Sequence, residues 1–185
     1  MEVEVLLAGR INLPEVRSIV AWANGLPERL SRLWRLACGE DRRTGVNALW
    51  VMSHLPEGDA PWIVSLRDEM IDRLLNENDA SKKRLLLELL RGQDYKADEI
   101  RTDFLDFCLS KINSEAEPYA VRCFCIYTAL KMCRHFPELI SELEGHLDLM
   151  DYQELSPGLK SAVRQTKAKI KKCKTSLSNT LRSLR

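Results

Sequence analysis

An internal repeat limits the folds open to this chain more than any other feature. The segment Ala48–Glu57 aligns without gaps to Ala129–Glu138, with identities at Ala, Leu, His, Pro and Glu. The offset equals two units of about 40 residues, which is the period of helical-hairpin repeats. A leucine-rich stretch, Lys82–Leu90, lies halfway between the copies and takes the place of a degenerate middle unit. The sequence therefore predicts stacked helical hairpins.

The hydrophobic pattern supports helices along the whole chain. Apolar residues recur at helical spacing in Pro61–Leu75 and in Ala97–Ile112, and no strand-like alternation interrupts them. Ser114 and Glu117 have the spacing of a capping box before a helix that contains Val121–Arg134. Because the connections are short, neighbouring helices should be antiparallel. We predict an all-α chain of about nine or ten helices, arranged as three to four hairpins.

The repeat also carries a family resemblance. Val121-Arg122, then Ala129-Leu130 and Pro137-Glu138-Leu139, resemble the second helix of a HEAT repeat, and Asn47–His54 resembles the same element in an earlier unit. The resemblance covers roughly residues 26–170 and extends to small HEAT-like proteins of unknown function from Bacteroidetes-type bacteria. It implies a HEAT/ARM-like α-α superhelix of three to four hairpins. Proteins of this class mostly bind other proteins through surfaces made by stacked hairpins.

The charge distribution divides the chain. The net charge is only +1, yet residues 160–185 contain nine basic residues and no acid. The other 19 basic and 27 acidic residues give the first 159 residues a net charge of −8. We therefore expect a HEAT-like domain over residues 1–159 and a basic C-terminal helix or tail over residues 160–185. The tail could bind phosphates, or it could contact the acidic body, through Lys167, Lys169, Lys171, Lys172 and Lys174.

No motif of an enzyme is present. The chain lacks a G-x-S-x-G elbow, a Gly-rich phosphate loop, an H-E-x-x-H pair and a G-x-G-x-x-G fingerprint. Its six cysteines contain no C-x-x-C pair, and Cys123 and Cys125 are two apart on a helix, so they cannot share a metal ion. We expect no enzymatic activity, no cofactor and no metal site. Free, mostly buried thiols would suit a reducing compartment, and we predict a cytoplasmic protein without a membrane span.

Six residues are candidate contacts to a partner. Arg42, Lys82 and Arg122 are spaced by 40 and could line one edge of the repeats, or they could pair with acids on neighbouring repeats. His54 and His135 share a repeat position and could form a row, or each could bond to carbonyls in a last helical turn. Trp50 could anchor a partner or pack in the core. The full set is Arg42, Trp50, His54, Lys82, Arg122 and His135.

These features predict a non-enzymatic scaffold that binds another protein. The alternative is a nucleic-acid-binding protein related in architecture to the HEAT-like DNA alkylation-repair proteins. In that alternative the basic tail and the row of Arg42, Lys82 and Arg122 would hold the phosphates. The catalytic acid and the aromatic residues of that repair family have no matching positions here, so the likeness concerns architecture alone.

Overall fold

The structure is a computed structural model that describes residues 2–183, and the side chains of residues 2–175. Within that range the chain forms eleven α-helices and two short 3-10 helices, and no strand. It divides into two compact units, Met1–Gln93 and Asp94–Arg185. The predicted all-α class is confirmed, with slightly more helices than expected. In the described chain, every helix is too short or too polar to span a bilayer.

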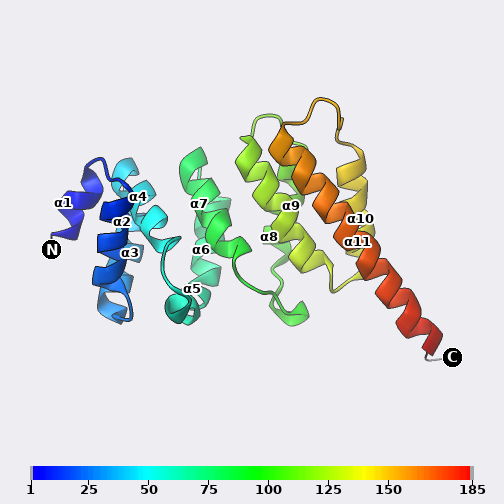
Figure 1. Ribbon diagram of the computed structural model, residues 1–185, viewed down its shortest axis with the longest axis horizontal. Coiled ribbons are helices and arrows are strands. Elements are labelled where there is room, and N and C mark those ends of the chain that lie inside the picture. The colour runs from blue at the N-terminus through cyan, green and yellow to red at the C-terminus, as the bar shows by residue number, and fades with distance from the viewer. Residues whose placement is uncertain (1, 184–185) are drawn as a thin grey trace. The chain divides into compact units, whose positions relative to one another are not determined.

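The first unit is built on two helical hairpins. Helices α3 and α4 form one hairpin and α6 and α7 the other, and the two second helices, α4 and α7, contact each other (Figure 1). Helices α1 and α2 also pack on α4. The bounds are α1 Val3–Ala8, α2 Leu13–Ala23, α3 Pro27–Cys38, α4 Arg42–Met52, η1 Glu57–Asp59, α5 Ala60–Ser65, α6 Arg67–Leu75 and α7 Ala80–Arg91.

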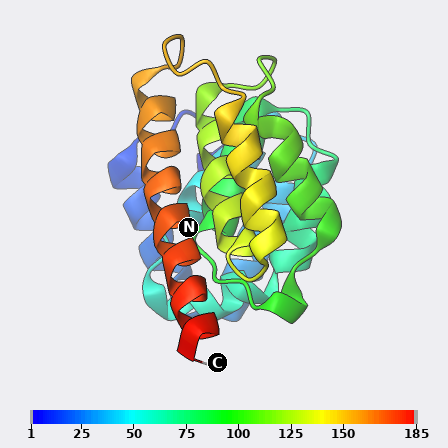
Figure 2. The same cartoon turned by 90° about the vertical axis from the view of Figure 1, so that its right-hand side faces the viewer.

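The second unit contains two more hairpins, α8 with α9 and α10 with α11. Helix α9 is central, because it contacts α8, α10 and α11. Figure 2 shows α11 running alongside α9 and α10. The bounds are η2 Ala97–Glu99, α8 Thr102–Ile112, α9 Tyr119–Cys133, α10 Pro137–Asp148 and α11 Pro157–Ser183.

Side chains at the helix starts explain where several helices begin. Asn12 and Glu15 form a complete capping box at α2. Asp41 accepts from the backbone of Thr44 at 2.7 Å, and Asp79 accepts from the backbone of Ser81 and Lys82 at 2.9 Å, so an aspartate caps both α4 and α7. The capping box expected from Ser114 and Glu117 is wrong. Pro118 occupies the cap position of α9 without a side-chain bond, and Glu117 pairs with Lys111 at 3.1 Å.

The two repeat copies have the same local structure. In each, the last turn of a helix closes with the same backbone bonds: Ser53 N–H donates to the carbonyls of Leu49 and Val51, and Arg134 N–H to those of Leu130 and Met132. The following residue, His54 or His135, donates to the carbonyl three residues before it. The sequence match therefore marks an equivalent helix end and turn.

The leucine-rich helix α7 contributes a large set of buried side chains to the core of the first unit. Leu86, Leu89 and Leu90 are buried as predicted, with 1%, 7% and 0% of their surfaces exposed. Trp34 is also buried, and its indole N–H donates to Glu69 at 2.7 Å, which satisfies the polar end of the ring.

The basic segment expected from residue 160 is continuous with the fold. Helix α11 begins at Pro157, and its apolar residues Leu159, Ala162, Val163 and Ile170 are buried. Contacts with α9 and α10 account for that burial. The first half of the basic helix is therefore part of the hydrophobic core of the second unit. Of the predicted basic residues, Arg185 lies outside the described chain, and so does the side chain of Arg182.

Candidate functional site

The three basic residues spaced by 40 stand at the starts of α4, α7 and α9, but their surroundings differ. Arg42 is exposed and binds Asp79 through Nε at 2.6 Å, so it links the starts of α4 and α7, the second helices of two successive hairpins. Lys82 is only 5% exposed, and its amine end lies against Gly45 of α4. Arg122 is 8% exposed and donates from Nε to the carbonyl of Ile112 at 2.9 Å. Each therefore makes a structural contact, and only Arg122 also lines a pocket.

The two repeat histidines are held by backbone carbonyls. His54 Nδ1 lies 2.9 Å from the carbonyl of Trp50, and its ring packs edge-on against that half-buried indole, with centroids 6.0 Å apart. His135 Nε2 lies 2.7 Å from the carbonyl of Tyr95. A ring N–H that donates to a carbonyl is not available as a base at that nitrogen. These contacts support the structural alternative for both histidines.

The lysines of the basic helix separate onto opposite faces of α11. Lys167 binds Asp148 at 2.5 Å, and Lys174 binds Glu144, so both charges are matched by acids of α10. Lys169 and Lys172 lie on the other face, beside α9. Lys171 is exposed. Residues seven apart share a helix face and residues two apart do not, which explains this separation. Part of the tail thus contacts the acidic body, and part remains open.

A basic groove lies between α9 and α11. It has a volume of about 370 Å³, and its walls are Lys131 and Arg134 on α9 and Lys169 and Lys172 on α11. The apolar side of the groove is formed by Leu130 and by the half-buried Cys173. Asp94 approaches Lys131 at 3.7 Å and Arg134 at 3.9 Å, which are long ion pairs. Lys169 and Lys172, in contrast, have no ion pair among the described residues.

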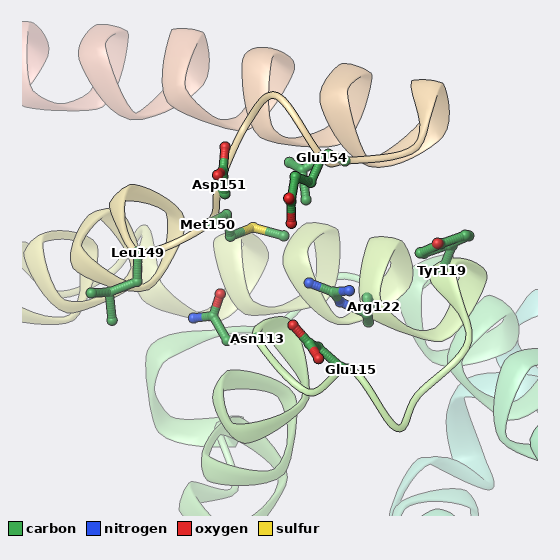
Figure 3. Close-up of a pocket in the computed structure, with 9 residues that line it drawn as sticks. Asn113, Glu115, Tyr119, Arg122, Leu149, Met150, Asp151 and Glu154 are labelled. Carbon is green, nitrogen blue, oxygen red and sulfur yellow. The ribbon is translucent and has the colours of Figure 1, made fainter.

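A second hollow, which we call the Arg122 pocket, opens at one end of the second unit (Figure 3). Its volume is about 420 Å³. The loop between α8 and α9, the first turn of α9 and the loop between α10 and α11 line it with polar groups: Asn113, Glu115, Tyr119, Arg122, Asp151 and Glu154. Leu149, Met150 and Leu155 add apolar surface.

Within the Arg122 pocket the guanidinium lies between carboxylates of two loops. Figure 3 shows Glu115 on one side of Arg122 and Glu154 on the other. Among the described residues, the guanidinium of Arg122 makes no ion pair within 4.0 Å, and its only hydrogen bond is the one from Nε. Asn113 anchors the first loop by donating to the carbonyl of His146 at 3.0 Å. The pocket thus holds a buried cation whose outer nitrogens face open space.

The cysteines form no site. All six are free, with Cys108, Cys125 and Cys133 buried and the others half-buried. Burial, aided by the neighbouring Cys125, raises the pKa of Cys108 well above its usual range. Burial, followed by the charge of Glu142, raises the pKa of Cys133 to about 12. These thiols stay neutral and unreactive at physiological pH. Across the described residues, no group of three or more His, Cys, Asp or Glu side chains could hold a metal ion.

Sequence reasoning singled out Lys169, Lys172 and Arg122, but it missed the other residues that line the same groove and the same pocket. Lys131 and Arg134 are three apart near the end of α9, a spacing that places both on one helix face. That spacing was the available local signal, but Arg29, Arg32 and Arg35 of α3 share it, so it does not single out this pair. The acids of the Arg122 pocket gave no such signal, because they lie in loops far apart in the sequence.

Comparison with known families gives one match. A family model described as a HEAT repeat domain matches residues 3–170. The match begins in α1 and ends in α11, so it includes helices of both units. The HEAT resemblance predicted from the sequence is confirmed, and it extends to the amino-terminal helices. No curated protein and no solved structure matches the chain.

Proposed function

This chain belongs to the family of HEAT repeat domains, and on that premise we propose that it is a non-enzymatic scaffold that binds another protein. Its binding surface is the basic groove between α9 and α11. The occupant is an acidic segment of the partner protein, with apolar residues that reach Leu130. Helical repeats are typical scaffolds because their stacked hairpins present extended surfaces.

The uncompensated charge of Lys169 and Lys172 is the observation that carries this proposal. Both lysines are exposed and have no ion pair among the described residues, and Lys131 and Arg134 bring two more positive charges to the same groove. Like charges that line one groove repel each other, and a bound acid would relieve that repulsion. Two other lysines of α11 differ in this respect, because Lys167 and Lys174 each form an ion pair with a carboxylate of α10.

The surroundings of the groove favour a protein over a nucleic acid. On the other side of α11, Asp148 and Glu144 of α10 neutralise Lys167 and Lys174, so the open basic surface does not continue past the groove in that direction. The apolar floor at Leu130 suits an aliphatic side chain better than a sugar-phosphate chain. Phosphate contacts alone would need a longer basic track.

Other observations support a binding role in a reducing compartment. The carbonyl contacts of His54 and His135 are consistent with a structural role for both histidines. Six free thiols are typical of proteins that stay in the cytoplasm. The finer resemblance to small HEAT-like proteins of Bacteroidetes-type bacteria stays a prediction.

The test is a fluorescence-anisotropy titration with a labelled amphipathic peptide of glutamate and leucine at helical spacing. We expect the double substitution Lys169→Glu and Lys172→Glu to weaken binding by about tenfold or more, since two charge contacts are reversed. The matched control is Arg164→Glu with Lys171→Glu, which makes the same charge change at exposed positions of α11 outside the groove. The control should bind the peptide almost as the wild type does.

A second titration with duplex DNA separates the two functions. On the scaffold proposal, the duplex binds more weakly than the acidic peptide at physiological salt. Tighter binding of the duplex, lost in the groove variant and steeply weakened by salt, would establish the nucleic-acid alternative instead. Equal peptide binding by the groove variant and the control variant would show that the groove is not the binding surface.

A further inference from the structure

We propose that the Arg122 pocket binds a basic amino acid, with the α-carboxylate on Arg122 and the cationic side chain against the surrounding carboxylates. This site is separate from the basic groove and does not depend on the scaffold function. Its ligand chemistry is that of lysine, ornithine or arginine, either free or as the last residue of a peptide.

The state of Arg122 is the first reason. Burial of a guanidinium costs free energy unless its donors are satisfied, and here only Nε has a partner among the described residues. The outer nitrogens face the pocket, as Figure 3 shows. A planar fork of N–H donors of this kind matches a carboxylate with two parallel hydrogen bonds. An anionic group of the ligand therefore belongs on Arg122.

The carboxylates are the second reason. Glu115 and Glu154 line the pocket from opposite loops, and neither has an ion pair among the described residues. Both lie more than 4.0 Å from the nitrogens of Arg122, so the guanidinium does not neutralise them at contact distance. Asp151 adds a third carboxylate, and one of its oxygens accepts from the backbone of Gln153 at 3.0 Å. Cationic groups of the ligand belong against these three acids.

The charge balance selects the class of ligand. One arginine and three carboxylates leave the pocket with two excess negative charges. A basic amino acid pairs its carboxylate with Arg122 and brings a cationic side chain to the acids, and the free form brings an α-ammonium group as well, so its net positive charge reduces this negative excess. A neutral amino acid would leave the excess of two negative charges unchanged, and a diamine would leave Arg122 unsatisfied.

The size and the apolar walls fit the same ligand. A volume of about 420 Å³ lies within the range of about 300–1,000 Å³ that is usual for small-molecule sites. Met150 and Leu155 offer aliphatic surface to a methylene chain that connects the two ends of the ligand. Tyr119 is exposed at the edge of the pocket, where its ring can receive an ammonium group.

The experiment is isothermal titration calorimetry of the full chain with L-lysine. We expect binding of L-lysine, and binding weaker by about tenfold or more for cadaverine, which lacks the carboxylate, and for norleucine, which lacks the terminal amine. Nα-acetyl-lysine distinguishes the two sources. If it binds as well as lysine, the natural ligand is a carboxyl-terminal lysine of a peptide, and if it does not, the free amino acid is favoured.

Substitutions at exposed acids keep the test independent of folding. Glu115→Gln and Glu154→Gln should each weaken lysine binding by about tenfold, because each removes one charge-assisted contact. The matched control is Glu138→Gln, an exposed acid on α10 that does not line the pocket. No heat of binding with millimolar lysine, or equal binding by all three variants, would overturn the proposal. In either case the pocket acids would serve only to balance the charge of Arg122.

Discussion

The side chain of Lys82 lies directly against Gly45, so closely that a Cβ atom on that glycine would come within 2.7 Å of Lys82 Cε and 2.9 Å of Nζ. The carbonyl of Ala37 would be 3.0 Å away from the same Cβ. This contact joins α7 to α4, and each of these is the second helix of a hairpin in the first unit. Gly45 is therefore required by the close approach of a buried lysine.

We predict that Gly45→Ala destabilises the protein, although alanine normally gains about 1 kcal/mol over glycine in a helix interior. The new methyl group must displace a lysine that has almost no exposed surface. In a Lys82→Ala background, the loss of stability caused by Gly45→Ala should be smaller by about 1 kcal/mol or more, because the side chain that obstructs the new methyl group is absent. Urea unfolding followed by circular dichroism measures the cycle. Equal costs in both backgrounds would identify the Ala37 carbonyl as the obstacle instead.

The leucine-rich helix gives the second prediction. Leu86 is enclosed, whereas Leu89 borders an apolar hollow of about 200 Å³ that also touches Met52 and Ile63. Leu86→Ala should cost about 3–5 kcal/mol and Leu89→Ala about 2–3 kcal/mol, because an open site loses fewer contacts on truncation. Chemical denaturation of both variants tests the order, and a larger loss at Leu89 would contradict it.

The third prediction concerns the basic helix. Ile170 is fully buried although it lies among lysines, and α11 packs on α9 and α10. Ile170→Ala should cost about 2–4 kcal/mol, while Lys171→Ala should change the free energy of unfolding by less than about 0.5 kcal/mol. Thermal and urea unfolding of the two variants would measure this difference. If both changes are small, the second half of α11 contributes little to the core.

The fourth prediction is a pH dependence at the cap of α7. Although burial opposes it, the backbone N–H of Lys82 and the guanidinium of Arg42 hold the pKa of Asp79 below its ordinary value of 3.8. A carboxyl group with a lowered pKa stabilises the fold above that ordinary value, and the contribution is lost as the pH falls below it. The stability difference between the wild type and Asp79→Asn should therefore shrink on acidification below pH 3.8.

The control for this pH effect is Asp98→Asn, at an exposed position of η2. Its stability difference from the wild type supplies the baseline for an aspartate that caps no helix in the same pH range. Denaturant midpoints at several pH values measure both variants. A flat difference for Asp79→Asn as well would show that the cap survives protonation of its carboxyl group.

The sequence predicted those parts of the structure that depend on local pattern. The hairpins, the repeated helix ends at Ser53 and Arg134, and the buried leucines of α7 all follow from hydrophobic period and turn residues. The start of α9 shows the limit of this reasoning. Ser114 and Glu117 had the right spacing for a cap, but Glu117 pairs with Lys111 across the turn, and Pro118 begins the helix.

The candidate sites were harder to predict because they depend on how helices and loops pack. The lysines of α11 formed one uniform set in the sequence, and only the position of α10 decides that Lys167 and Lys174 are matched by acids. Likewise, Arg134 and Lys172 line the same groove only because α9 lies beside α11. The Arg122 pocket is lined by two loops, and no local sequence pattern predicts that these loops lie close together.

The burial of Cys108 and Cys125 gives the second unit a natural probe of its own motions. A thiol reagent can reach these side chains only after α8 and α9 separate, so the rate of labelling in native buffer reports how often that hairpin opens. Since both sulfur atoms are present in the unmodified chain, mass spectrometry could follow this opening without any engineered label. Occupancy of the basic groove, which α9 lines, would then slow the reaction if partner binding holds the hairpin closed.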